Sequence, residues 1–239
     1  NIDPHTGNAL YATANFTWYN SQITDSTSID ITSGKQLIIP VNVKGSYEAS
    51  LNAGKSITVG QNNSSIAAGI TASYARNTIF NNGIANDNNT FSITPDFNIN
   101  YYPINKLSIA IKGSASWNVR RFSAMAGLPE KNWLLTYGVE TTLVLPFNMT
   151  LETSLDGFSA LGLASGFNNN IFLLNVALNK QISKRFSLQA SARDLLNNNA
   201  GINRITGNGY IEDRKNNALG QYFMLSVLYK FRHFPTSKK

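Results

Sequence analysis

One pair of acidic residues has the composition of a hydrolytic site. Glu152 and Asp156 stand four positions apart in a segment of alternating polarity, and glycosidases use two carboxyl groups. On a strand, four positions separate the two by about 13 Å, which is too far for either glycosidase geometry. Glu140, in the preceding segment, is expected to approach Glu152 and form a carboxylate cluster. No apolar residues surround these acids to raise a pKa, so a solvated polar wall is the favoured interpretation and no enzymatic activity is expected.

Metal and cofactor chemistry is not indicated either. The two histidines, His5 and His233, lie near opposite ends of the chain, and neither has a further ligand residue at metal-binding spacing. The sequence contains no cysteine, which excludes disulfides, thiolate metal sites and cysteine nucleophiles. Phosphate-binding loops, dinucleotide fingerprints and nucleophile elbows are also missing. We therefore expect no catalytic residues, no bound metal and no cofactor.

The composition restricts the class of protein. Of 239 residues, 42% are hydrophobic and only 14% are charged, and 32 are asparagine. No apolar run approaches the ~18 residues that a transmembrane helix needs. The net charge of +7 raises the question of nucleic acid. The basic residues are dispersed, however, with small groups at Arg120–Arg121, at Lys184–Arg185 and in the tail, so nucleic-acid binding is not expected.

Alternation of polar and apolar residues extends over nearly the whole chain and predicts about ten strands. We place them at 9–20, 41–54, 64–80, 90–102, 107–120, 133–145, 149–157, 171–180, 186–194 and 220–231. Long connections (21–40, 81–89, 121–132, 158–170 and 195–219) alternate with short ones (55–63, 102–106, 145–149 and 179–186). This order predicts an antiparallel up-and-down sheet with the long loops at one end, and with the short turns and both chain ends at the other.

Charged residues inside these strands fall on one face. The charges predicted to share the polar face are Lys44, Glu48, Asp96, Lys112, Glu140, Glu152 and Arg193. Arg76 is the exception, but it lies at the loop end of its strand, where a long side chain reaches water. Because side chains alternate with period two, the opposite face avoids charge for a physical reason.

Two environments produce such a face: the core of a soluble sandwich and the lipid around a membrane barrel. The strands are long enough to cross a bilayer, and the polar face is mostly uncharged. Aromatic residues also gather at the strand ends, as in the belts of membrane proteins. The predicted belt residues are Trp18, Trp117 and Trp133 at the loop end, and Tyr101, Phe147, Phe186 and Phe231 at the turn end. We therefore predict an all-β transmembrane barrel segment over residues 1–231, followed by a polar tail at 232–239.

Several segments carry a resemblance to a known family. They are "IIPVNVKGSYEASLNAG" (38–54), "GFNNN" (166–170), "ARDLLNNNAGINR" (192–204) and "NGYIEDRKNNALGQYFMLSVLYKF" (208–231). Together they resemble the C-terminal barrel region of outer-membrane proteins of the TonB-dependent receptor superfamily. The resemblance implies a 22-stranded barrel in the outer membrane, with an N-terminal plug that closes the lumen. It also implies energised uptake of a large or scarce ligand through contact with TonB.

On that interpretation the chain is the last part of the barrel, and both of its ends lie on the periplasmic side. The expected partners are the lipid bilayer, the plug and remaining strands upstream, and the transported ligand. The segment that contacts TonB would also lie upstream. Two alternatives stay open: a small self-contained outer-membrane pore or adhesin, and a soluble extracellular domain that binds glycan or protein.

The last strand adds one expectation. Its outward face should be Phe223, Leu225, Val227, Tyr229 and Phe231. Its inward face (Tyr222, Met224, Ser226, Leu228 and Lys230) is unusually apolar for a lumen wall. We expect a plug or an inward-folded loop to pack against it.

Overall fold

The computed structural model describes residues 8–60, 62–124, 131–162, 169–199, 202–206, 211–215 and 219–231. The strands are β1 (Ala9–Tyr19), β2 (Gln22–Ile29), β3 (Gln36–Val43), β4 (Ser46–Val59), β5 (Ser64–Asn81), β6 (Ile84–Ile104), β7 (Leu107–Phe122), β8 (Lys131–Leu145), β9 (Met149–Leu161), β10 (Asn169–Gln181), β11 (Phe186–Arg193), β12 (Ile202–Thr206), β13 (Ile211–Lys215) and β14 (Tyr222–Tyr229). In these described ranges, no helix has the length and apolar character needed to cross a membrane.

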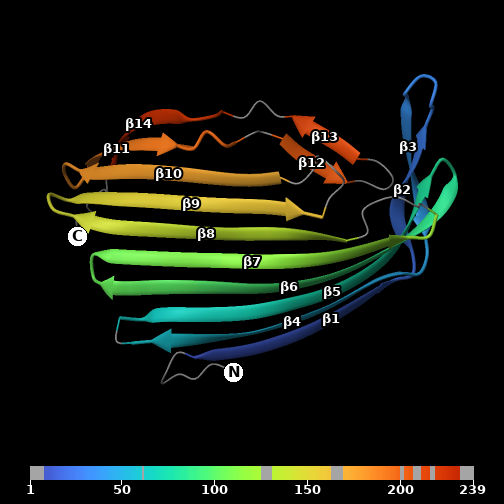
Figure 1. The fold of residues 1–239 in the computed structure, drawn as a ribbon, viewed down its shortest axis with the longest axis horizontal. Helices are drawn as coiled ribbons and strands as arrows, with labels where there is room; N and C mark the ends of the chain where they lie inside the picture. The colour runs from blue at the N-terminus through green and yellow to red at the C-terminus, as the bar shows by residue number, and fades with distance from the viewer. Residues whose placement is uncertain are drawn as a thin grey trace, which may run out of the picture.

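Ten of the strands form one continuous antiparallel path in the order β1-β4-β5-β6-β7-β8-β9-β10-β11-β14. Each pairs with its neighbour along the path (Figure 1). The prediction of an all-β, antiparallel, up-and-down sheet is confirmed. Among the described residues β1 and β14 are the two edges and do not pair with each other, so the sheet is not closed.

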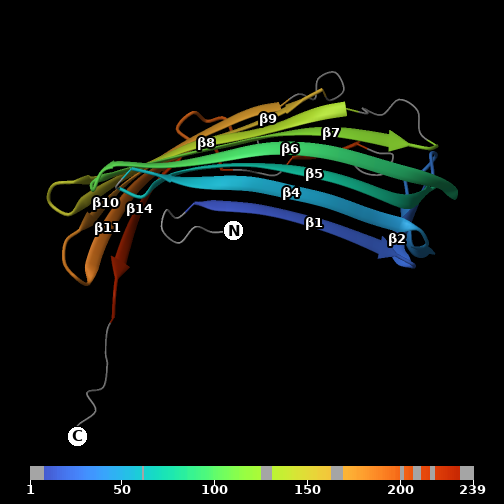
Figure 2. The same cartoon turned by 90° about the horizontal axis from the view of Figure 1, so that it is seen from below.

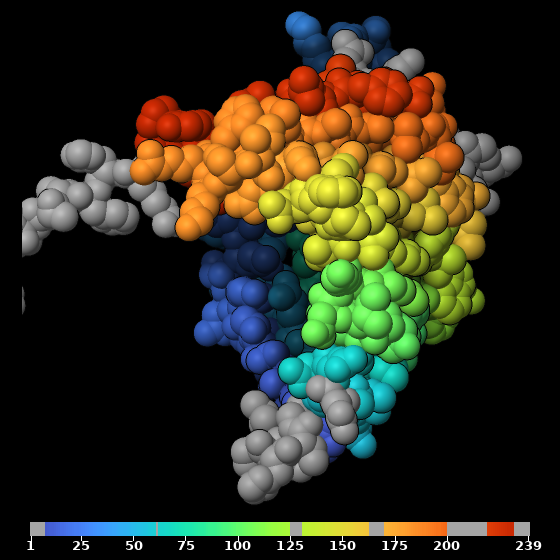
Figure 3. Space-filling view, turned by 90° about the vertical axis from the view of Figure 1, so that its left-hand side faces the viewer, coloured from blue at the N-terminus to red at the C-terminus, as the bar shows by residue number. Residues whose placement is uncertain are grey.

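The sheet is strongly curved. Seen from below, the strands bend together into a trough (Figure 2). Figure 3 looks at the end that carries the short turns and shows an arc of strands with a hollow between the orange and the blue segments. The curvature gives the sheet a concave and a convex face, and the period of two distributes successive residues between them.

Turns and loops alternate between the two ends as predicted, but one loop is shorter. Residues 81–89 were expected to form a long loop, whereas β5 and β6 extend through them to a tight turn at Asn82 and Gly83. Both residues have positive φ, of 49° and 78°. Asn-Gly is the favoured pair for such a hairpin turn, because both residues tolerate the left-handed region. The Asn82-Gly83 pair is therefore the sequence signal for this hairpin.

The predicted strand at 41–54 is confirmed from Ser46 onward, in β4, but its first residues are not part of it. It is interrupted at Lys44 and Gly45, and the φ of +79° at Gly45 breaks the extended backbone. Residues before the break belong to β3, which pairs with β2 in a hairpin where a loop had been expected. This hairpin stands at the loop end of the sheet (Figure 1) and touches β5 through two parallel pairs. Lys44 therefore lies in a connection and not in the middle of a strand.

The tip of the β2–β3 hairpin is organised by Asp30. Its carboxylate accepts hydrogen bonds from the backbone N–H of Thr32 at 2.8 Å and from the Ser33 hydroxyl at 2.8 Å. These bonds stabilise the charged form and lower the pKa of Asp30. The tip is thus a defined turn at the loop end.

Candidate functional site

Polar side chains on one face of the sheet are joined across neighbouring strands. Asn52 donates to Thr71 at 3.0 Å, Ser73 bonds Ser92 at 2.7 Å, and Ser114 bonds Thr136 at 2.7 Å. Further along the sheet, Asn175 donates to Ser154 at 3.1 Å. The strand registers place these residues opposite or diagonal to one another on the same face. Short polar side chains therefore satisfy each other along this wall while leaving room in front of it.

The central feature of the wall is an ion-pair group that spans three strands. Lys112 on β7 places Nζ 2.6 Å from Oε1 of Glu140 on β8, and 3.5 Å from Oδ1 of Asp156 on β9. The second contact crosses the whole width of β8. Gly138 makes this possible, since it pairs with both Lys112 and Asp156 and a Cβ there would lie 2.8 Å from Lys112 Cε.

Glu152 and Arg193 complete a charged cluster with these three residues. All five line one open hollow of about 350 Å³. Glu140 stands opposite Ser154, and hence diagonally between Glu152 and Asp156, so the expected approach of Glu140 to Glu152 agrees with the register. The side chains of Lys112, Glu140 and Asp156 are about half exposed, so solvent screens the pairs and each contributes little to stability. The cluster is suited to contact a polar or charged ligand.

The other residues predicted to face the lumen are spread along the same wall. Glu48 on β4 pairs with Thr17 and Ala75. Asp96 on β6 lies over Gly69, where the hydroxyl of Tyr11 also approaches after crossing Gly54. Lys44 stands apart at the loop end, for the reason given above. Asp156 was paired with Glu152 in the sequence but was not among the predicted lumen-facing residues, and Gly138 was not singled out; the structure makes Asp156 an ion-pair partner of Lys112.

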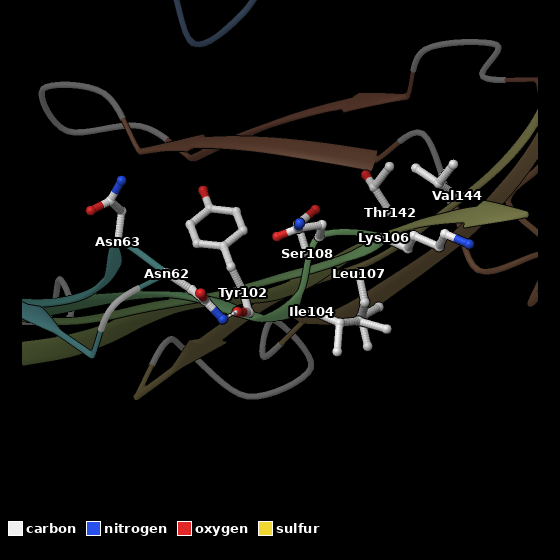
Figure 4. A pocket seen from close by; sticks show the side chains of 10 residues that line it. Asn62, Asn63, Tyr102, Ile104, Lys106, Leu107, Ser108, Thr142 and Val144 are labelled. Carbon is white, nitrogen blue, oxygen red and sulfur yellow. Dashed lines mark hydrogen bonds between the residues drawn. The ribbon is translucent and has the colours of Figure 1, made fainter.

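A second hollow of about 590 Å³ lies at the short-turn end. Figure 4 shows Tyr102, Ser108 and Thr142 rising on one side of the sheet toward the strand that faces them, while Leu107 and Ile104 point the other way. A shift of register between Tyr101 and Ile104 causes this change of side. The polar residues thus line the concave face.

The convex face carries a line of aromatic rings near the loop end. Trp18 stacks on Tyr47 at 5.7 Å and Tyr47 on Tyr74 at 5.8 Å. Trp117 contacts Phe91 at 6.1 Å and Trp133 at 6.3 Å. Trp18, Trp117 and Trp133 were predicted belt members. Tyr47 and Tyr74 were not, although alternation places them on the same face as Leu51 and Ala72.

The predicted aromatic residues of the turn end are more scattered. Tyr101 lies on the convex face of β6, and Phe147 lies in the β8–β9 turn with a φ of +62°. Phe186 begins β11 and pairs with Tyr229, whose ring meets Phe231 edge-on at 4.6 Å. Their role as a belt stays a prediction.

A model of the outer membrane protein beta-barrel family matches residues 20–229. The chain belongs to this family. No curated protein matches the chain. No solved structure matches it either.

In an outer membrane beta-barrel family, the convex outer face of the sheet is the face expected to contact lipid. Directly below the aromatic line, the described convex positions form a band without charged side chains that is about eight residues long on each strand. The first charges below the line are Lys55, eight positions after Tyr47, and Lys180, eight positions after Phe172. Eight residues of a tilted strand cover about 20 Å along the membrane normal, close to the ~25 Å apolar band of outer-membrane barrels. Neither lysine was predicted to lie on this face.

Arg76, which was the predicted exception to the polar face, lies above the aromatic line and is paired with an acid. Arg76 lies on the convex face and places Nη2 2.8 Å from Oδ2 of Asp87, which also accepts a bond from Thr78 at 2.7 Å. Among the described residues, no group of three or more potential metal ligands occurs. His5 and His233 lie outside the described residues, as does the tail at 232–239.

Proposed function

We propose that this chain forms part of the barrel of an outer-membrane transporter of the TonB-dependent type, which takes up a large or scarce ligand. The observation that carries the proposal is the contrast between the two faces of the sheet. The convex face has an uncharged band flanked by aromatic and basic residues, while the concave face carries hydrogen-bonded polar rows and the charged cluster. A lipid-facing surface and an aqueous lumen call for this division.

The parent barrel and its plug are part of the proposal. Within the described strands the outer edges of β1 and β14 have no partner, which leaves both available to further strands upstream. On the concave side of β14, Met224 is 43% and Leu228 is 54% exposed. Apolar side chains are unfavourable in a water-filled lumen, and a plug packed against β14 would cover them.

The remaining roles follow from this function. The charged cluster and the loops would contact the ligand during passage, and the chain itself would perform no catalysis. It would need no cofactor and would bind no nucleic acid. Both ends of the segment would lie on the periplasmic side, because short turns occupy that side of outer-membrane barrels.

The test uses the full-length protein in its outer membrane. Photo-crosslinkable residues placed near its N-terminus should capture TonB, and capture should increase when the ligand is supplied as a crude nutrient extract. A matched strain that lacks TonB serves as control for uptake-dependent growth. Growth and nutrient depletion that are equal in the two strains would reject energised uptake.

A self-contained outer-membrane barrel is the second candidate. It is favoured by the even number of strands on the main path, since β1 and β14 run antiparallel and would pair if the sheet closed. This candidate predicts stepwise conductance in planar bilayers from the 239-residue chain alone. A plugged transporter predicts that the full-length protein conducts no ions at low voltage.

A further inference from the structure

The short-turn end has a corner where basic side chains gather. Two turns and the end of β14 meet there: Gln181 donates its backbone N–H to Asn148 O at 3.0 Å, and Lys230 donates its own to Arg185 O at 2.8 Å. The basic side chains of this corner are Lys180, Lys184, Arg185 and Lys230. We call these four residues the basic corner. They bring together positions separated by 50 residues of sequence.

The charge of the corner is uncompensated. The segments that build it, 145–149, 179–188 and 226–231, contain no acidic residue. Within the described part of the chain, none of the four basic side chains forms an ion pair. At the opposite end of the sheet, by contrast, Arg76 is paired with Asp87. A cluster of cations without carboxylates attracts anions from outside the chain.

Aromatic side chains surround the corner, as is expected at a membrane interface. Phe147 is 81% and Phe231 is 88% exposed, and Phe186 pairs directly with Tyr229 on the convex face. Lys180 Nζ lies 5.7 Å from the centre of the Phe147 ring and also donates to the Phe147 carbonyl at 2.5 Å. Rings of this kind settle at headgroup depth. The ammonium and guanidinium groups are then held at the level of lipid phosphates.

We propose that the basic corner binds the headgroup of an anionic phospholipid in the leaflet that meets the short turns. Lys184 and Arg185 are exposed in the β10–β11 turn and supply freely oriented donors. Lys230 is also exposed and lies opposite Arg185 at the rim, where its backbone N–H is bonded to Arg185 O. Lys180 is held in place by its contacts with Phe147 and forms one side of the site. An anionic headgroup offers both a phosphate oxygen and net charge, whereas a zwitterionic one has no net charge. The inference rests on the membrane embedding in the proposed function, but not on transport.

The experiment is a lipid competition with the full-length protein purified in detergent. Equal amounts of phosphatidylglycerol and phosphatidylcholine are added, and retained lipids are counted by native mass spectrometry. The wild-type protein should retain phosphatidylglycerol preferentially. In the variant K184Q/R185Q/K230Q the preference should fall, by up to about fivefold for each charge removed.

Two further variants make the result specific. K35Q/R121Q/K131Q removes as many charges from the loop end and should keep the preference. K184R/R185K/K230R keeps the charges of the corner and should also keep it. Equal retention of the two lipids by the wild-type protein would overturn the proposal, as would an equal loss in the loop-end variant. Loss of TonB capture with an intact lipid preference would reject only the transport function.

Discussion

At the scale of single residues, several long side chains of this sheet cross a strand by passing over a glycine. Tyr137 crosses Gly157, bonds Ser159 at 3.2 Å and meets Phe172 at 5.7 Å between ring centres. A Cβ at position 157 would collide with the Tyr137 ring, which has no flexible end to move. We expect Gly157→Ala to lower the free energy of unfolding by about 1–3 kcal/mol, measured by urea titration in lipid vesicles.

Gly138 provides the matched control, because it lies on the adjacent strand beneath Lys112 instead of an aromatic ring. The end of Lys112 can swing aside, and alanine also restricts the unfolded chain. Gly138→Ala should therefore change stability by less than about 1 kcal/mol. Equal losses at the two positions would show that the ring does not matter. In the double variant G157A/Y137A the losses should not add, because the two residues form one contact.

At the scale of elements, β3 pairs only with β2 in the part of the chain that the structure describes, and its other edge is partly blocked by a proline. Asp30 donates its backbone N–H to Lys35 O at 2.9 Å, so that pair is hydrogen-bonded. In an antiparallel hairpin, hydrogen-bonded and non-hydrogen-bonded residue pairs alternate. Counting from Asp30 and Lys35, Asp25 and Pro40 form a non-hydrogen-bonded pair, so the backbone polar groups of Pro40 point away from β2, toward the outer edge of β3. Because proline has no N–H there, strand addition to β3 is interrupted at its centre.

We expect Pro40→Ala to restore the missing donor and to promote self-association through β3. Sedimentation in detergent should show dimers or larger species that the wild-type protein lacks. Val41→Ala is the control, since the backbone of Val41 faces β2 and not the outer edge. A monomeric Pro40→Ala variant would show that the edge is already protected by other means.

The strands of the main path were largely predictable, because polar and apolar residues alternate with the period of two that a pleated strand imposes. The ten predicted strands correspond to the ten on the path, although 41–54 lost its first residues to β3. The β2–β3 hairpin was missed because polar Ser, Thr and Asp residues in β2 resemble a loop. Faces were also predictable from alternation. The ion pair from Lys112 to Asp156 was not, since it depends on the register of three strands and on a glycine between them.

At the scale of the whole molecule, the uncharged band distinguishes lipid from water. Leu51 lies on the convex face midway between Tyr47 and Lys55 and is 54% exposed. In water, arginine at so exposed a position would cost little. In the centre of a bilayer, Leu51→Arg should cost about 2–4 kcal/mol. Ser50→Arg, one position away on the concave face, should cost less than about 1 kcal/mol. Urea unfolding from vesicles compares them, and equal costs would contradict a lipid-facing band.

The open edges raise the last question about the whole molecule, namely whether β1 and β14 pair with each other. Residues 1–239 contain no cysteine, so engineered pairs within them do not compete with a native thiol of this segment. Asn15→Cys is combined in turn with Met224→Cys, Ser226→Cys and Leu228→Cys, which lie on the concave face of β14. Asn15→Cys with Ser50→Cys is the positive control, because these residues are opposed on β1 and β4 and a disulfide needs Cα atoms within about 7 Å.

A larger parent barrel predicts that only the control pair forms an intrachain disulfide, because the edge of β1 is then occupied by an upstream strand. A self-contained barrel that closes in one of these three registers predicts that the matching β14 position also crosslinks. The full-length protein in isolated outer membranes is oxidised, and mobility is compared before and after reduction. Crosslinking at any β14 position would show that β1 and β14 are neighbours. It would exclude upstream strands between them, and therefore a 22-stranded parent barrel. A barrel of ten strands would then have to accommodate the exposed Met224 and Leu228 without a plug.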